Sequence, residues 1–221
     1  PFNTDINTVR GQETGYATWN PLKNKFNSAS GGAVTLSDGN LTVVGNASAA
    51  GSNVAGTIGV NSGKYYIEFT HVADPQTNDS CGFGIRRSLD EGLFSGWDTY
   101  TRGSRIRNSD NGYFSSASNQ AYSTKSSVGD VIGVAFDIIG NYCQITLNSI
   151  IMSSSSSAGL EGYTWYPYFA SDGEGSVTLN CGQKPFKFPP PDGFQPLNAA
   201  NVKPVKVIAR PDQFVSAVLW T

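Results

Sequence analysis

Residues 128–147, VGDVIGVAFDIIGNYCQITL, carry an alternating apolar pattern on both sides of a Gly-Asn pair. Every second residue of 132–138 is apolar, and so is every second residue of 143–147. This period of two is typical of an extended strand with one buried face. Gly140 and Asn141 tolerate the positive φ angles that tight turns require. The segment therefore predicts a β-hairpin that turns on these two residues.

Other short segments have the same strand-like character and are separated by turn-forming residues. The apolar face of a hairpin needs a second layer to cover it, and the chain offers enough strands to build one. We therefore predict an all-β fold, an antiparallel two-sheet β-sandwich of about ten short strands. The further predicted strands are residues 40–44, 54–60, 64–72, 81–86, 105–107, 112–114, 165–171 and 176–181.

Four other segments are read differently. Residues 16–19 predict a short strand in a polar N-terminal region, and residues 88–127 are long and poorly patterned. The five serines of 153–157 predict a mobile loop. Residues 185–191, PFKFPPP, predict an extended polyproline-like segment that winds away from the sandwich.

Composition narrows the classes of partner. The length of 221 residues suits one sandwich domain with extensions. Charged residues make up only 14% of the chain and the net charge is −2, which gives no bulk attraction to nucleic acid. No apolar run approaches the ~20 residues that span a bilayer. We therefore predict no nucleic-acid partner and no membrane span.

The three cysteines and the single histidine give no metal-site pattern. Cys81, Cys143 and Cys181 each fall in a strand-like apolar stretch, so we predict buried, reduced thiols. A Cys81–Cys181 bridge stays open at this point. With only one histidine, His71, in the chain, we predict no zinc site built from these groups. No metal and no cofactor are predicted.

No catalytic residue is predicted either. His71 ends the predicted strand 64–72 and has no nucleophile elbow near it in sequence, so we assign it a structural role at the strand end. The acidic residues at 90–91 and at 172 and 174 lie in Gly-rich segments. Carboxylates are common in such turns for turn chemistry alone, so we do not interpret them as a glycosidase pair.

One stretch combines the residue types of a binding site. Residues 96–113, GWDTYTRGSRIRNSDNGY, place aromatic side chains among arginines in a long connection. Aromatic residues and arginine are enriched where interfaces bind most strongly, and they also suit sugars. The alternative is that the tryptophan is a core residue and that the arginines solvate strand edges. The predicted partner-binding residues are Trp97, Tyr100, Arg102, Arg105 and Arg107.

The order of several motifs resembles that of a SPRY domain. Over about residues 35–198 the chain reads GKYYIEF, CGFGI, VGDVIGVAFD, QITLN, YPYFAS and VTLNCGQKPFKFPPPDGFQPLN. The opening TWNPL and LSDGNLTV, the terminal GQKPFKFPPPDGFQPLN and the final RPDQFVSAVLWT are most similar to SPRY-like modules of bacteriophage virion and tail proteins. The family usually closes its second hairpin strand with Lys-Asn-Gly, where this chain has Asn148-Ser149-Ile150.

The resemblance implies a fold and a domain division. It implies a concanavalin A-like jelly roll of two antiparallel sheets, in agreement with the hairpin, and a recognition scaffold without catalysis. Residues 1–34 are then an N-terminal extension, 35–198 the SPRY-like sandwich, and 199–221 a C-terminal extension that leads into a further unit. The chain is accordingly interpreted as a piece of a longer polypeptide.

The expected function is that of a non-enzymatic recognition or structural module of a bacteriophage virion protein. It would sit in a tail fibre, a tail-associated protein or a capsid decoration, and bind host-surface carbohydrate or neighbouring virion proteins. A homo-oligomer in the particle is compatible with this role. Two alternatives remain at this stage: a polysaccharide-degrading enzyme on the same sandwich, and a cellular SPRY adaptor that binds a peptide.

Overall fold

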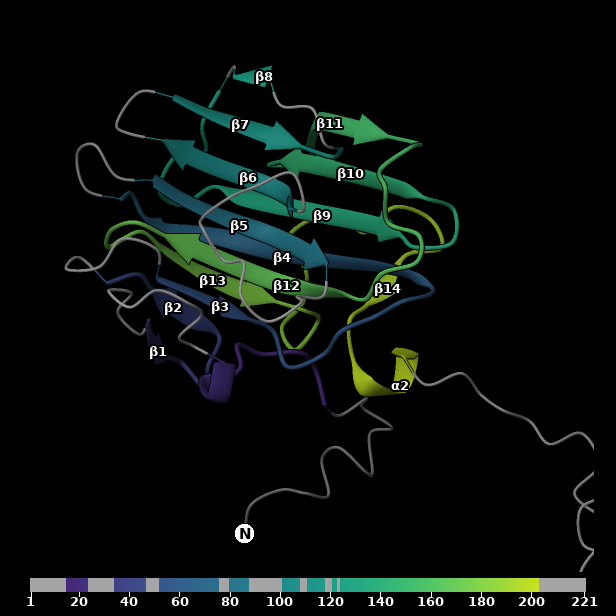
Figure 1. The fold of residues 1–221 in the computed structure, drawn as a ribbon, viewed down its shortest axis with the longest axis horizontal. Helices are drawn as coiled ribbons and strands as arrows, with labels where there is room; N and C mark the ends of the chain where they lie inside the picture. The colour runs from purple at the N-terminus through teal and green to yellow at the C-terminus, as the bar shows by residue number, and fades with distance from the viewer. Residues whose placement is uncertain are drawn as a thin grey trace, which may run out of the picture.

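Two antiparallel β-sheets face each other across a core of aromatic and aliphatic side chains (Figure 1). This confirms the predicted all-β sandwich. The computed structural model describes residues 15–23, 34–46, 52–75, 80–87, 101–107, 111–117, 121–122 and 124–202.

The larger sheet has eight strands within the described residues. Seven follow the order β1-β2-β13-β4-β9-β10-β11, and β14 pairs with β4 in parallel. Their bounds are β1 (Thr35–Ser37), β2 (Thr42–Val44), β4 (Lys64–Ala73), β9 (Val131–Asp137), β10 (Tyr142–Leu147), β11 (Ile150–Ser155), β13 (Ser176–Asn180) and β14 (Gln195–Pro196).

The smaller sheet has six strands in the described part of the chain, in the order β3-β12-β5-β6-β7-β8. Two short helical turns, η1 (Pro21–Lys23) and α2 (Ala199–Val202), lie outside both sheets. The strands are β3 (Ser52–Ala55), β5 (Ser80–Arg87), β6 (Thr101–Arg107), β7 (Asn111–Ser115), β8 (Ala121–Tyr122) and β12 (Trp165–Ser171).

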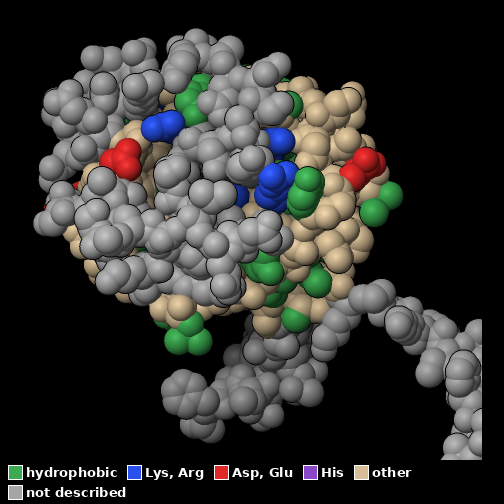
Figure 2. Space-filling view, viewed as in Figure 1, with side chains coloured by type: hydrophobic (Ala, Val, Ile, Leu, Met, Phe, Trp, Pro, Cys, Tyr) green, Lys and Arg blue, Asp and Glu red, His purple; other side chains and the backbone are tan. Residues whose placement is uncertain are grey.

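Neutral groups dominate the described surface on the face shown in Figure 2. In Figure 2 most of the described surface is tan, the colour of the backbone and of neutral polar side chains, with isolated charged and apolar groups between them. This is the surface expected of a chain with only 14% charged residues.

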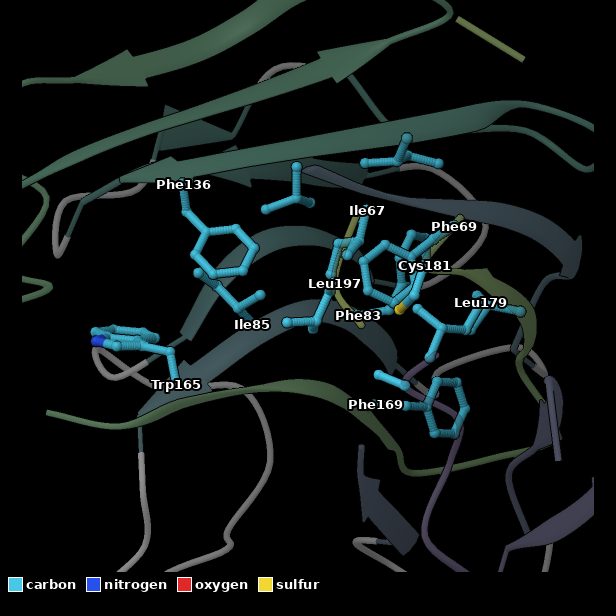
Figure 3. Packing of buried hydrophobic residues seen from close by; sticks show 14 of the residues in the cluster. Ile67, Phe69, Phe83, Ile85, Phe136, Trp165, Phe169, Leu179, Cys181 and Leu197 are labelled. Atoms are coloured by element: carbon cyan, nitrogen blue, oxygen red, sulfur yellow. The ribbon is translucent and has the colours of Figure 1, made fainter. Parts of the chain in front are cut away.

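Rings from opposite sheets meet in the core (Figure 3). Phe69 of β4 and Phe83 of β5 have ring centroids 5.6 Å apart, a contact that adds to the apolar area that both rings bury. The three cysteines are free and buried, as predicted, and no bridge links Cys81 to Cys181.

The predicted hairpin is present as β9 and β10, but its turn is longer than two residues. Asp137 pairs with Tyr142, so residues 138–141 form the turn. Asn141 adopts a φ of 52°. Gly140 is needed for a different reason: its backbone N–H donates to Asp137 Oδ1 at 2.9 Å, and a Cβ there would overlap the Asp137 carboxylate.

Three of the five serines lie in a strand and not in the predicted loop, which begins only at Ser156. Residues Ser153 to Ser155 belong to β11, which pairs with β10. A two-residue turn with positive φ at Asn148 (48°) and Ser149 (75°) closes this hairpin, so the altered turn sequence still makes a tight turn. Composition alone misled the prediction because pairing with β10 overrides the weak strand preference of serine.

The proline-rich segment does not wind away from the sandwich, contrary to the prediction. The backbone N–H groups of Lys187 and Phe188 donate to the two carboxylate oxygens of Glu68, each at 2.9 Å. The Phe186 ring packs edge-on against Tyr66 with centroids 4.9 Å apart. We call residues 183–194 the strap, because they lie across the outer face of β4.

The segment 15–20 joins the two sheets. Ala17 N–H donates to the Leu197 carbonyl at 3.1 Å, and Asn20 N–H donates to the Ala55 carbonyl at 2.9 Å. The strand predicted at 16–19 is present only as isolated bridges, from Tyr16 to residue 198 and from Trp19 to residue 56. The domain boundaries proposed from the sequence stay a prediction.

Candidate functional site

Strand β6 carries the three arginines of the predicted binding set, and residues 111–113 of the same segment lie in β7. Ile106 pairs with Cys81 of β5, and both are buried in the core between the sheets. Because successive side chains of a strand point to opposite faces, Arg102 shares the core face with Ile106, whereas Arg105 lies on the outer face of the smaller sheet. Arg105 stands between Gly82 of β5 and Tyr113 of β7 in the register.

A glycine pair brings β5 and β6 close together beside this position. Gly84 lies opposite Gly103, which has a φ of 152°. A Cβ on Gly84 would overlap the Arg102 carbonyl oxygen, and a Cβ on Gly103 would overlap the Phe83 carbonyl oxygen. Glycine is therefore required at both positions for the strands to approach.

Arg102 is buried and serves packing inside the fold. Its side chain is 4% exposed, and its Nε donates to the Ala158 carbonyl at 2.8 Å. The guanidinium lies over the Trp165 ring, 5.4 Å from its centroid. Trp165 Nε1 donates in turn to the Leu160 carbonyl at 2.8 Å. Arg102 thus fastens residues 158–160 to the sandwich.

Arg105 is partly exposed and is held by a polar relay. Its Nη2 donates to Ser80 Oγ at 2.9 Å, and Ser80 Oγ donates to Asp172 Oδ2 at 2.8 Å. The backbone N–H of Asp172 also donates to the Ser80 carbonyl at 2.8 Å. A guanidinium carries five N–H donors, and the Ser80 bond uses one. We call Arg105, Ser80 and Asp172 the Arg105 relay.

The Arg105 relay can recognise an acceptor but carries out no bond chemistry by itself. An oriented guanidinium suits a carboxylate, a phosphate or a row of hydroxyl groups. Asp172, one of the acidic residues considered as a turn carboxylate, accepts a hydrogen bond from the Ser80 hydroxyl. Its backbone N–H donates to the Ser80 carbonyl. The structure therefore gives Asp172 a positioning role toward Arg105.

The other predicted binding residues are only partly placed. Arg107 lies in β6 and pairs with Ser80 and Asn111. Its side chain, together with all of Trp97 and Tyr100, lies outside the described residues. The structure thus brings Arg102, Arg105 and Arg107 onto one strand, and the binding role of the five-residue set stays a prediction.

His71 lies inside β4 with a fully buried side chain, and two partners that sequence reasoning missed lie against it. Its Nδ1 is 3.3 Å from Ser126 Oγ, and its Nε2 is 3.5 Å from Asp74 Oδ1. Lys125 Nζ lies 3.7 Å from the same Asp74 oxygen. Asp74 follows His71 by three residues, a spacing that could have indicated it, whereas Ser126 is 55 residues away.

Serine, histidine and aspartate are the residue types of an acyl-transfer triad, but this cluster is not arranged for that chemistry. A nucleophilic serine must meet a substrate carbonyl and an oxyanion site. Ser126 is 0% exposed and His71 is 1% exposed, so no substrate can reach Ser126 Oγ. The cluster fastens the end of β4, where the Gly129 N–H also donates to the His71 carbonyl at 2.8 Å.

The burial of His71 predicts a loss of stability in mild acid. Burial lowers the pKa of His71 below its usual 6.5, and the negative charge of Asp74 opposes this in part. The unfolded chain then binds a proton that the folded chain resists, so the free energy of unfolding decreases as the pH falls below about 6.5. In urea titrations from about pH 7.5 to about pH 5, His71→Leu is expected to show a flatter pH dependence than the wild type.

The neighbouring groups Asp74, Lys125 and Asp130 are present in both proteins, so the difference between the two slopes isolates His71. Equal slopes for wild type and His71→Leu would show that the imidazole does not resist protonation in the folded state.

The described residues show neither a metal-binding cluster nor a membrane-spanning helix. Across the described ranges, no group of three or more His, Cys, Asp or Glu side chains is arranged to hold a metal ion. In the same part of the chain, no helix is long and apolar enough to cross a membrane.

Comparison with known proteins supports the fold. No family model matches the sequence, and no curated protein matches it. Among solved structures, the chain is similar to the SPRY domain of human HERC1, with a TM-score of 0.57 at 14% identity, covering 76% of this chain and 99% of that one. It is also similar to the TRIM65 PSpry domain, with a TM-score of 0.53 at 12% identity, covering 79% and 94%. The SPRY-like sandwich expected from the motif order is therefore confirmed at the level of fold.

Proposed function

We propose that this chain is a non-enzymatic recognition module that binds a partner through the surface around Arg105. The observation that carries the proposal is the Arg105 relay: a partly exposed guanidinium on the outer face of the smaller sheet, oriented by Ser80 and Asp172. Pre-orientation lowers the entropy cost of binding an acceptor. The likeness to SPRY domains of HERC1 and TRIM65 supports a protein-interaction role.

The recognition role fits the rest of the described chain better than an enzymatic one does. His71 is buried. Asp172 orients the Arg105 guanidinium through the Ser80 hydroxyl. A glycosidase would need two carboxyl groups about 5–10 Å apart on opposite sides of a sugar. Asp172 instead accepts a hydrogen bond from Ser80, which in turn accepts one from the Arg105 guanidinium. This arrangement suits the positioning of a side chain that holds a ligand group.

We further propose that the module belongs to a bacteriophage virion protein. The support is the order of motifs, above all TWNPL and LSDGNLTV near the start and GQKPFKFPPPDGFQPLN near the end, and the neutral surface. In that setting the partner is a host-surface carbohydrate or a neighbouring virion protein. Both present carboxylates or hydroxyl groups that a guanidinium can bind.

The Arg105→Ala variant tests the binding surface. Binding of the purified chain to whole host cells and, in parallel, to the purified virion proteins is expected to weaken about tenfold or more, because the variant loses a pre-oriented charged donor. The assay arm that loses binding identifies the partner class. Isothermal titration calorimetry or surface plasmon resonance measures the dissociation constant.

Lys184→Ala is the matched control, since Lys184 is also a cation, has a side chain that is 59% exposed, and pairs with Asp38 away from β6. It is expected to bind like the wild type. Equal binding by all three proteins, with unchanged circular dichroism, would remove Arg105 from the binding surface.

A further inference from the structure

Strand β11 is the longest sheet edge in the described part of the molecule. The two sheets end at β1, β11, β3 and β8, which have 3, 6, 4 and 2 residues. An edge strand has backbone N–H and C=O groups on one side that no neighbouring strand of its sheet pairs. Short edges offer few such groups, so β11 is the edge with the greatest capacity to pair with another strand.

The sequence around β11 lacks the residues that keep edges from pairing. Native edges are protected by charged residues, above all lysine, and by proline. Residues 138–160 contain no Asp, Glu, Lys, Arg or Pro, although charged residues make up 14% of the whole chain. The edge therefore carries neither of these protecting residue types along its length or just beyond its two ends.

Two large aliphatic side chains are exposed at the start of this edge. Ile150 is 68% exposed and Ile151 is 58% exposed, and no residue of β11 is fully buried. Covering these side chains would add apolar burial to any backbone pairing. They are neighbours on a strand, so they point to opposite faces of the sheet and both faces of a joined sheet would gain contact.

The edge is also held in place before any partner arrives. Ser153 Oγ lies 2.7 Å from Ser116 Oγ and accepts the Ser116 backbone N–H at 3.2 Å. These contacts link the middle of β11 to the residue that follows β7 of the smaller sheet. On its other side, β11 pairs with β10. A partner strand therefore meets an ordered template and pays little ordering entropy on this side.

We propose that a second copy of this chain pairs with β11 in antiparallel fashion, which joins two eight-stranded sheets across a two-fold axis. In such an interface residue i of one copy faces residue j of the other and the reverse, so a charged residue close to the two-fold axis would lie near the same charge of the second copy. The uncharged stretch 138–160 removes that repulsion. It also offers no charge by which an acidic or basic partner would be selected, which favours self-association.

The dimer is expected to be weak and to carry two binding surfaces. The pairing register shifts between Ile145 and Thr146 and leaves Met152 without a partner on β10; such a bulge shortens the regular ladder on each side. The edge belongs to the larger sheet, whereas Arg105 lies on the outer face of the smaller sheet. Dimerisation therefore leaves both Arg105 relays in place, and two linked surfaces bind a multivalent target more tightly than one.

Sedimentation velocity of the full chain from about 1 µM to about 1 mM tests the proposal. The wild type is expected to shift from monomer to dimer as concentration rises. Ile151→Lys is expected to raise the dimer dissociation constant about tenfold or more, because it puts like charges at the edge. Ser154→Lys, at an exposed position of β11 that loses no apolar area, is expected to do the same.

Ile139→Lys is the matched control: Ile139 is 69% exposed and lies in the turn between β9 and β10, away from the edge. It is expected to dimerise like the wild type. Circular dichroism of each variant verifies folding, and amide hydrogen exchange of residues 150–155 is expected to slow as dimer forms.

Three results would overturn the proposal. The first is a wild type that stays monomeric over the whole range. The second is a dimer that both β11 variants retain. The third is a dimer in which the exchange of residues 150–155 is unchanged, which would place the contact on another face.

Discussion

Replacing Trp19 with alanine is expected to lower the free energy of unfolding by about 4 kcal/mol, the usual cost of a buried aromatic ring. Trp19 is 0% exposed. Its ring centroid lies 6.2 Å from that of Phe69 in the larger sheet and 6.4 Å from that of Phe169 in the smaller one. Its Nε1 donates to the Leu41 carbonyl at 2.9 Å. The substitution thus leaves a cavity between the sheets and removes one of the two donors to the Leu41 carbonyl, which keeps the Leu179 N–H at 2.8 Å.

Denaturant unfolding followed by far-ultraviolet circular dichroism measures this loss without depending on tryptophan emission. Leu22→Ala is the control, because Leu22 is 92% exposed and lies three residues further along the same segment; its unfolding curve is expected to match that of the wild type. A loss below about 1 kcal/mol for Trp19→Ala would mean that residues 15–20 are an appendage and not part of the sandwich.

The second large effect is expected at Glu68, which fastens the strap. Glu68 is 3% exposed on the outer face of β4 and accepts the backbone N–H groups of Lys187 and Phe188 as well as the Tyr66 hydroxyl at 3.2 Å. Burial and the neighbouring negative charge raise the pKa of Tyr66 above its usual 10, so it stays a donor. Glu68→Ala removes a charged acceptor from three donors and is expected to cost about 3 kcal/mol.

Release of the strap can be detected directly by limited proteolysis. Trypsin cleavage after Lys187 is expected to accelerate at least tenfold in Glu68→Ala. The reason is that the backbone of the strap at Lys187 and Phe188 is no longer hydrogen-bonded to β4. Glu161→Ala, which removes the same side chain from an exposed position, is expected to be cleaved like the wild type. Equal cleavage rates in all three proteins would show that the Glu68 carboxylate is not what holds the strap.

The strand pattern of the central hairpin could be predicted because large apolar side chains recur at every second position along it, although the structure buries both faces of β9. Ile132, Val134 and Phe136 face the core on β9, and Cys143 and Ile145 face them on β10. Side-chain periodicity is a local property, so a single sequence reveals it. The need for a second sheet to cover the apolar face of this hairpin followed from the same pattern.

Features that depend on contacts between distant residues were not predicted. Ser80 and Asp172 are 92 residues apart, and no local signal marks them as partners of Arg105. Glu68 meets Lys187 and Phe188 across separations of 119 and 120 residues, so the proline-rich segment looked extended and unattached. The first part of the serine tract likewise became a strand only through its pairing with β10.

The different environments of Arg102 and Arg105 follow from a local property, the alternation of side chains along a strand. Arg102 and Arg105 are three residues apart on a strand, so their side chains point to opposite faces. Arg102 turns inward onto the Trp165 ring and Arg105 turns outward toward Ser80. Alternation along β6 would therefore have separated the packing arginine from the one in the Arg105 relay.

Hydrogen–deuterium exchange of the chain, with and without the partner found in the cell and virion binding assays, tests the central claim most directly. If the surface around Arg105 is the recognition surface, the partner slows exchange in β5 and β6, Ser80–Arg87 and Thr101–Arg107, and leaves β4 and the strap unchanged. Slowed exchange confined to the larger sheet, with β5 and β6 unaffected, would contradict the account.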